Sequence, residues 1–219
     1  MCPLCRVAHK ADREYLWHFF EEYAGTELGS EALRRARGFC LEHAAALRRL
    51  EVDGLRSTLG ISEIYEDAFT GIVEQLGRIS EPHSTAGPTA ACPACGNREA
   101  ELDHNARYLV DMLRDEPRTR DRYQGSTGLC LPHFALVWSA AGAAERTLLL
   151  EVQRRVATAV LAELTEHIRK QGSEARHEPP GPEHESWERA MWLTAGWPPP
   201  TDLIGQPERE TDADDLVAR

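Results

Sequence analysis

The chain has 219 residues, of which 42% are hydrophobic and 28% charged, and its net charge is −11. This composition is typical of a soluble globular protein, and no apolar run approaches the roughly 20 residues that span a bilayer. The acidic excess is concentrated after Ser173, and it disfavours non-specific binding to nucleic acid or to anionic lipid. No basic and apolar leader precedes Cys2, so we expect a cytoplasmic protein.

The first 79 residues are expected to form one helical metal-binding module. It opens with the motif CPLC at residues 2–5, and apolar residues at three- and four-residue steps then predict a helix over roughly 7–24. Ser30 is expected to cap a short returning helix, and a third helix should start at GFCLEH, residues 38–43. A longer helix follows, whose apolar stripe consists of Ile61, Ile64, Tyr65, Ala68, Phe69, Ile72 and Leu76.

A second module over residues 92–172 is expected to repeat the first after a linker over residues 80–91. It opens with CPAC at residues 92–95, followed by a helix that carries Leu102, Ala106, Leu109 and Leu113. Pro117 should open the returning helix and Gly125 should end it, before a further helix begins at GLCLPH, residues 128–133. The last long helix carries the stripe Leu149, Val152, Val156, Val160 and Leu164. We expect the two long helices to pack together and join both modules into one all-α bundle.

From residue 173 to 219 the chain is a proline-rich, acidic tail, which we expect to be flexible except for one short helix over residues 182–195. Trp187 and Met191 lie on one face of this helix, and Trp192 lies beside them. Tryptophans in a polar tail need to be buried. They could dock onto the chain's own helices or into the groove of a protein partner, and the sequence leaves both open.

The cysteines reveal an internal duplication. In each copy, 35 positions separate the second cysteine of the CPxC pair from the third cysteine, and a histidine follows three positions later. Every member of one copy lies 90 positions from its counterpart, and no cysteine is left over. Two identical frames rarely arise by chance. The candidate metal ligands are Cys2, Cys5, Cys40 and His43 in the first copy, and Cys92, Cys95, Cys130 and His133 in the second.

Three thiolates and one imidazole are a ligand set that zinc favours, and two pairs with this short spacing can close a tetrahedron around one ion. Because the returning helix should bring each C-x2-H beside its own CPxC pair, we predict that the four ligands of one copy surround one ion. The sequence therefore predicts two zinc ions per chain. Since each frame supplies four ligands, neither site is expected to keep an open position for catalysis.

Other uses of these residues remain open. Six cysteines could form three disulfides, and the CPxC pairs alone resemble redox-active motifs. An iron–sulfur cluster with Cys3His ligation would use the same residue types. Glu101 and His104 form an E-x-x-H on a predicted helix, as in di-iron bundles, but the other copy has no equivalent pair.

The combination CPLC…GFCxxH…CPAC…GLCLPHF resembles a family of uncharacterised prokaryotic proteins with this tandem cysteine–histidine arrangement. The resemblance covers about residues 1–170, and all eight ligand positions match it. It implies the metal sites and implies no reaction. We therefore expect a zinc-binding interaction scaffold or adaptor, with a thiol-based redox or metal sensor as the alternative.

Overall fold

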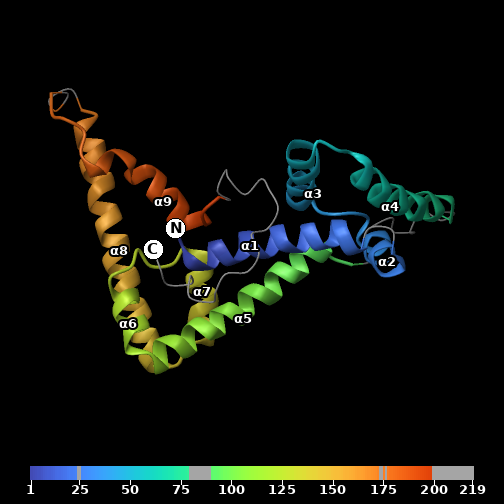
Figure 1. Ribbon diagram of the computed structural model, residues 1–219. Coiled ribbons are helices and arrows are strands. Elements are labelled where there is room, and N and C mark those ends of the chain that lie inside the picture. The colour runs from blue at the N-terminus through green and yellow to red at the C-terminus, as the bar shows by residue number, and fades with distance from the viewer. Residues whose placement is uncertain (24–25, 79–89, 173–174, 176, 199–219) are drawn as a thin grey trace. The chain divides into compact units, whose positions relative to one another are not determined.

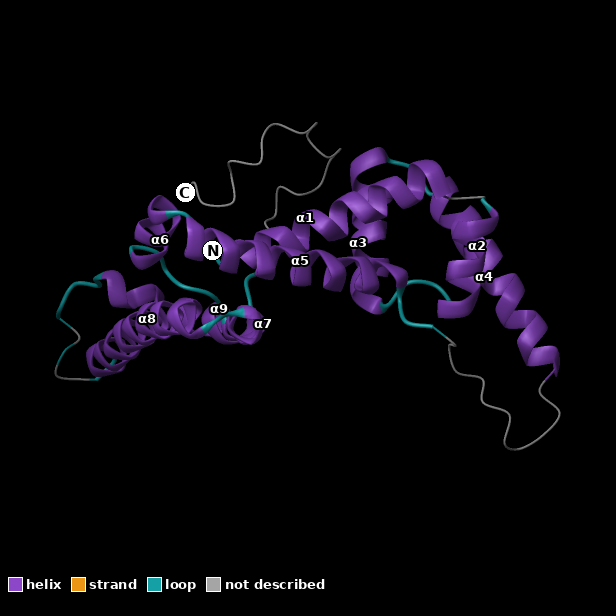
Figure 2. Cartoon of the chain, turned by 90° about the horizontal axis from the view of Figure 1, so that it is seen from below, coloured by secondary structure: helices purple, strands orange, loops and turns teal. Residues whose placement is uncertain are grey.

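The structure is a computed structural model that describes residues 1–23, 26–78, 90–172, 175 and 177–198 (Figure 1). All regular structure in these ranges is helical and none of it is a strand (Figure 2), which confirms the all-α class. No helix in the described ranges is both long enough and apolar enough to cross a membrane. Most of the expected linker, and the end of the acidic tail from residue 199, lie outside the described residues.

The described chain divides into two compact units, and neither of them is one continuous stretch. Unit 1 consists of Met1–Val7 and the described residues from Leu102 onward, whereas unit 2 consists of Ala8–Glu101. Each unit therefore contains the opening residues of the other sequence repeat. Two helices, α1 (Pro3–His18) and α5 (Pro93–Asp115), begin in one unit and continue into the other.

Unit 2 contains most of α1, five complete elements that follow it, and the start of α5. The helix α2 packs along α4, and the π-helical turn η1 contacts α2. The Thr26 hydroxyl caps α2 by accepting a hydrogen bond from the Gly29 N–H, so the prediction of a cap at Ser30 was wrong by one helical turn. The elements are η1 (Phe19–Tyr23), α2 (Glu27–Ala36), α3 (Leu41–Arg48), η2 (Arg49–Leu55) and α4 (Leu59–Arg78).

Unit 1 is built around the long helix α8, which contacts α6, α7, η3 and α9 (Figure 1). Pro117 opens α6 and Gly125 ends it, as the sequence predicted, because proline suits the first helical position. The predicted tail helix is present as η3 and α9, and α9 packs on α8 and α7 of its own unit. The elements are α6 (Pro117–Gln124), α7 (Leu131–Ala140), α8 (Ala143–Lys170), η3 (Pro182–Glu185) and α9 (Ser186–Ala195).

Each unit has its own hydrophobic core. In unit 1, Leu129, Val137 and Leu149 are fully buried beside the cysteines. In unit 2, the α4 stripe is only partly core: Ile64 and Ala68 are buried, but Phe69 and Leu76 are 59% and 56% exposed. The predicted stripe included too many residues, because only the helix face that carries Ile64 and Ala68 packs into the core of the unit.

Candidate metal centres

The eight predicted ligands gather into two groups of four. Site A consists of Cys2, Cys5, Cys130 and His133, and site B consists of Cys40, His43, Cys92 and Cys95. Within each group one potential ligand atom per residue lies within 4.8 Å of the others, so each group could hold one metal ion. Site A lies entirely in unit 1 and site B entirely in unit 2.

The predicted pairing of ligands within one sequence copy was wrong. Cys2 and Cys5 meet Cys130 and His133 of the second copy, while Cys40 and His43 of the first copy meet the second CPxC pair. Helix lengths explain the exchange. The 23 residues of α5 extend about 34 Å and the eight residues of α6 only about 12 Å, so the returning helix ends well short of its own CPxC pair.

Both sites are built from the first turns of helices. Cys2 precedes α1 and Cys5 lies in its first turn, while Cys40 and Cys130 are the N-cap residues of α3 and α7. Pro3 opens α1, and its missing N–H would have had no helical partner in any case. Since helix N-termini carry partial positive charge and free N–H groups, this placement stabilises the negative charge of three thiolates.

The glycines of GFC and GLC direct the chain into each site. Gly38 and Gly128 have φ of +91° and +70°, a region that residues with a side chain rarely adopt. A Cβ atom at Gly128 would also lie 3.0 Å from Oε1 of Gln153, and one at Gly38 would lie 3.0 Å from Cε1 of Tyr65. Gln153 in turn accepts a hydrogen bond from the Leu129 N–H and donates one to the Leu129 carbonyl, which fixes the backbone next to Cys130.

The ligand atoms lie close enough together to surround one tetrahedral ion. With Zn–S bonds of about 2.3 Å and Zn–N bonds of about 2.0–2.1 Å, tetrahedral geometry places sulfur about 3.6 Å from nitrogen and about 3.8 Å from sulfur. In site A, the sulfurs lie 3.1, 3.4 and 3.5 Å from Nδ1 of His133, and those of Cys5 and Cys130 are 3.7 Å apart. In site B, they lie 3.2, 3.4 and 3.6 Å from Nδ1 of His43, and those of Cys40 and Cys95 are 3.7 Å apart. In both sites the Nδ1 atom is the one that faces the sulfurs.

The ligands of each group shift one another's pKa values. Burial lowers the pKa of His43, but hydrogen bonds with Asp12 and Cys92 outweigh it and raise the pKa to about 10. Burial likewise lowers the pKa of His133, and the sulfurs of Cys130 and Cys2 raise it to about 9. Protonated imidazole thus provides the positive charge that the thiolates favour, and a metal ion that bound here would displace its proton.

A carboxylate and an arginine support the histidine of site B. Nε2 of His43 lies 2.9 Å from Oδ1 of Asp12, whose other oxygen accepts a hydrogen bond from Arg98 at 3.1 Å. Arg98 also donates to both carboxylate oxygens of Glu42, at 2.7 and 3.2 Å. A metal-ligating histidine commonly has such a carboxylate on its second nitrogen, because it fixes the ring and raises the basicity of the ligand.

Sequence reasoning missed this support. Ninety positions away, the counterparts of Asp12, Arg98 and Glu42 are Leu102, Ala8 and Pro132, so the internal repeat gave no signal. Asp12 and His43 belong to the first sequence copy, whereas Arg98, which binds Asp12, comes from the second. The E-x-x-H pair of Glu101 and His104 is exposed and belongs to neither ligand group.

The sequence model of one protein family matches residues 1–197, and that family is described as a "Family of unknown function (DUF6062)". The match includes all eight ligands and the tail helix. No curated protein matches the chain, and no solved structure does.

Proposed function

Because the chain belongs to this family of unknown function, we propose a role for it from its two ligand groups. It is a zinc-binding protein with two structural Cys3His sites. It serves as an interaction scaffold or adaptor. The main support for this proposal is that, in each group, four potential ligand atoms lie within 4.8 Å of one another.

The donor set and its spacing favour a single zinc ion in each group. Zinc takes thiolate and imidazole ligands in tetrahedral sites, and four protein ligands leave no position for a catalytic water. An iron–sulfur cluster distributes its ligands over two or more metal ions and would require them further apart. All six cysteines are free, which argues against the disulfide alternative. A cytoplasmic location, where thiols stay reduced, fits this chemistry.

The scaffold role rests on where the metals would act. Each ion would fasten the first turns of two helices that belong to distant parts of the sequence, and so would stabilise a surface for a partner. A candidate surface lies on α9, where Trp187 and Met191, one helical turn apart, are 51% and 48% exposed. We propose a protein partner here, since aromatic and methionine side chains are enriched in protein interfaces and the net charge of −11 opposes binding to nucleic acid.

Elemental analysis of protein purified without added metal tests the zinc proposal. We expect two zinc ions per chain in the wild type and one in Cys95→Ser. Iron with a visible charge-transfer band, or no bound metal, would refute it.

The partner surface is tested separately by affinity capture with wild type and Trp187→Ala/Met191→Ala, each shown to hold two ions. One protein that binds stoichiometrically to the wild type and not to the variant is the expected result, and equal capture by both would refute this surface.

A further inference from the structure

The two sites expose opposite parts of their ligand sets. In site A the sulfurs are buried, with Cys2, Cys5 and Cys130 only 1%, 3% and 1% exposed, and His133 is the half-buried ligand. In site B the histidine is fully buried and all three cysteines are half-buried. Reagents that attack sulfur can therefore reach site B more easily than site A.

The end of the tail covers the sulfurs of site A. After α9 the chain turns at Gly196, whose φ of +95° favours glycine, and the Trp197 N–H donates a hydrogen bond to Sγ of Cys5 at 3.3 Å. A Cβ atom at Gly196 would lie 3.7 Å from Sγ of Cys5 and 3.9 Å from Sγ of Cys130. The Trp197 side chain packs against the core cluster that contains all three cysteines. The tail backbone thus contacts the sulfur of Cys5, and at Gly196 it leaves no room for a larger side chain without contact with the sulfur of Cys130 as well.

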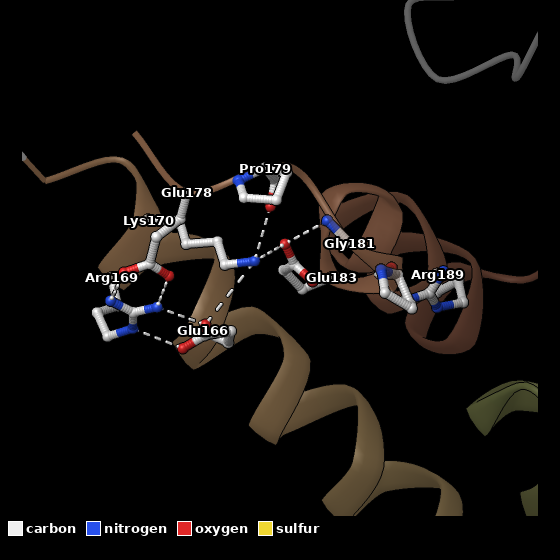
Figure 3. A network of polar contacts seen from close by, with 9 residues as sticks. Glu166, Arg169, Lys170, Glu178, Pro179, Gly181, Glu183 and Arg189 are labelled. Atoms are coloured by element: carbon white, nitrogen blue, oxygen red, sulfur yellow. Dashed lines mark hydrogen bonds and ion pairs between the residues drawn. The ribbon is translucent and has the colours of Figure 1, made fainter. Parts of the chain in front are cut away.

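The tail is also attached to α8 by a network of ion pairs (Figure 3). Lys170 donates to the Glu183 carboxylate at 2.8 Å and to the Pro179 carbonyl at 3.0 Å, and Arg169 pairs with Glu178. Further along, Arg189 of α9 pairs with Glu163. One end of the tail is bound to α8 and the other lies on site A. These contacts hold the end of the tail against the sulfurs of site A.

Site B has no equivalent cover among the described residues. There, the hydrogen-bond partners of the sulfurs are the other ligands of the site and the backbone of the ligand motifs themselves. Its additional contacts are on the histidine side, through Asp12 and Arg98. The internal repeat has therefore given two sites with the same ligands and different access to sulfur.

We propose that site B is the oxidant-responsive metal centre of this protein and that residues 186–198 form a cover that protects site A from the same reaction. The proposal rests on metal binding by both groups. It identifies a hydroperoxide as the class of reagent and the site B thiolates as the modified groups.

The reaction is a two-electron oxidation of two thiolates. One thiolate of site B attacks the peroxide, forming a sulfenic acid and releasing hydroxide (or alkoxide), and a second thiolate then attacks the sulfenic sulfur, forming a disulfide and releasing hydroxide. Both leaving anions take protons from solvent. Cys40 and Cys95, whose sulfurs lie 3.7 Å apart, are one pair that could form this disulfide. The disulfide would leave two of the four ligands of site B to hold a metal ion, so a bound ion would dissociate.

The test oxidises the metal-loaded full chain with hydrogen peroxide, measures the released zinc with a chromogenic chelator, and maps disulfides and alkylated cysteines by mass spectrometry. We expect one ion to be released per chain at a rate about tenfold or more above the second, with oxidation confined to Cys40, Cys92 and Cys95. Release of both ions at one rate, or oxidation first at Cys2, Cys5 or Cys130, would overturn the proposal.

Two variants test the cover. Gly196→Ala and Trp197→Ala should each increase the rate of ion release from site A about tenfold or more towards that of site B, because both disturb the tail where it meets Cys5. The matched control is Leu161→Ala, at a position of α8 that is 64% exposed and outside the cover, which should leave both rates unchanged. Unchanged protection of site A in both cover variants would refute the cover.

Cysteine alkylation in chelator-treated protein separates this proposal from the zinc proposal. A chain that bound no metal would refute zinc binding, yet the cover would still predict slower alkylation of Cys5 than of Cys95. Equal alkylation rates in the metal-loaded protein would refute the cover while leaving metal binding intact.

Discussion

Nε2 of His43 and Oδ1 of Asp12 are 2.9 Å apart, and this contact distinguishes site B from site A, where the position equivalent to Asp12 is Leu102. Asp12 lies on α1, and His43 lies on α3 in the first turn after Cys40. The pair therefore links the orientation of one metal ligand to the packing of two helices.

Replacing Asp12 by Asn should weaken metal binding at site B by about 10–100-fold and leave site A unchanged, because the neutral amide no longer raises the basicity of the histidine. Competition titration against a chelator would resolve the two binding steps. Asp103→Asn, at an exposed aspartate that pairs with Arg107, is the control and should bind like the wild type. Equal weakening of both steps by Asp12→Asn would contradict the assignment.

The exchanged pairing can be tested by counting metal ions in two double variants. Cys2→Ser/Cys130→Ser removes two ligands of site A, so we expect one ion per chain, whereas Cys2→Ser/Cys40→Ser damages both sites and should leave less than one ion. Pairing within one sequence copy would give the opposite result. Both variants lose two thiols, so they serve as controls for each other.

Loss of the ion in site A should destabilise unit 1. Structural zinc contributes roughly 10–16 kcal/mol of apparent binding free energy in small domains, comparable with a whole domain's stability of about 5–15 kcal/mol. Cys130→Ser and chelator treatment should therefore both lower the melting temperature measured by circular dichroism. Unchanged melting together with altered thiol reactivity would favour a redox sensor over a scaffold.

Glu51 should be a determinant of the stability of unit 2. It is fully buried, and its two carboxylate oxygens accept hydrogen bonds from the N–H groups of Gly60 and Ile61 at the start of α4, at 2.8 and 2.7 Å. Glu51→Ala leaves the buried Gly60 N–H and the partly buried Ile61 N–H without this partner, and an unsatisfied buried donor costs about 1–3 kcal/mol. Urea denaturation should show a loss of about 2 kcal/mol or more. Glu63→Ala, on the exposed side of α4, should change the stability by less than about 0.5 kcal/mol.

Local pattern alone identified the helices and the side chains that gather at the two sites. The spacing of Cys130 and His133 places both on the first turn of one helix, and Pro117 and Gly125 begin and end α6 through backbone restrictions that act within a few residues. The number of ligands per group follows from the repeat. These features could be predicted because their causes lie within one helical turn or in the duplication itself.

Tertiary structure decided which ligands meet and what surrounds them. The partners of Cys5 depend on the lengths of α1 and α5 relative to the helices that return the chain, which no short motif encodes. Asp12 reaches His43 across 31 positions, and the Trp197 N–H reaches Cys5 across 192. Such contacts form only when helices from distant parts of the chain pack together, so two copies of one motif acquire different surroundings although their ligand sets are identical.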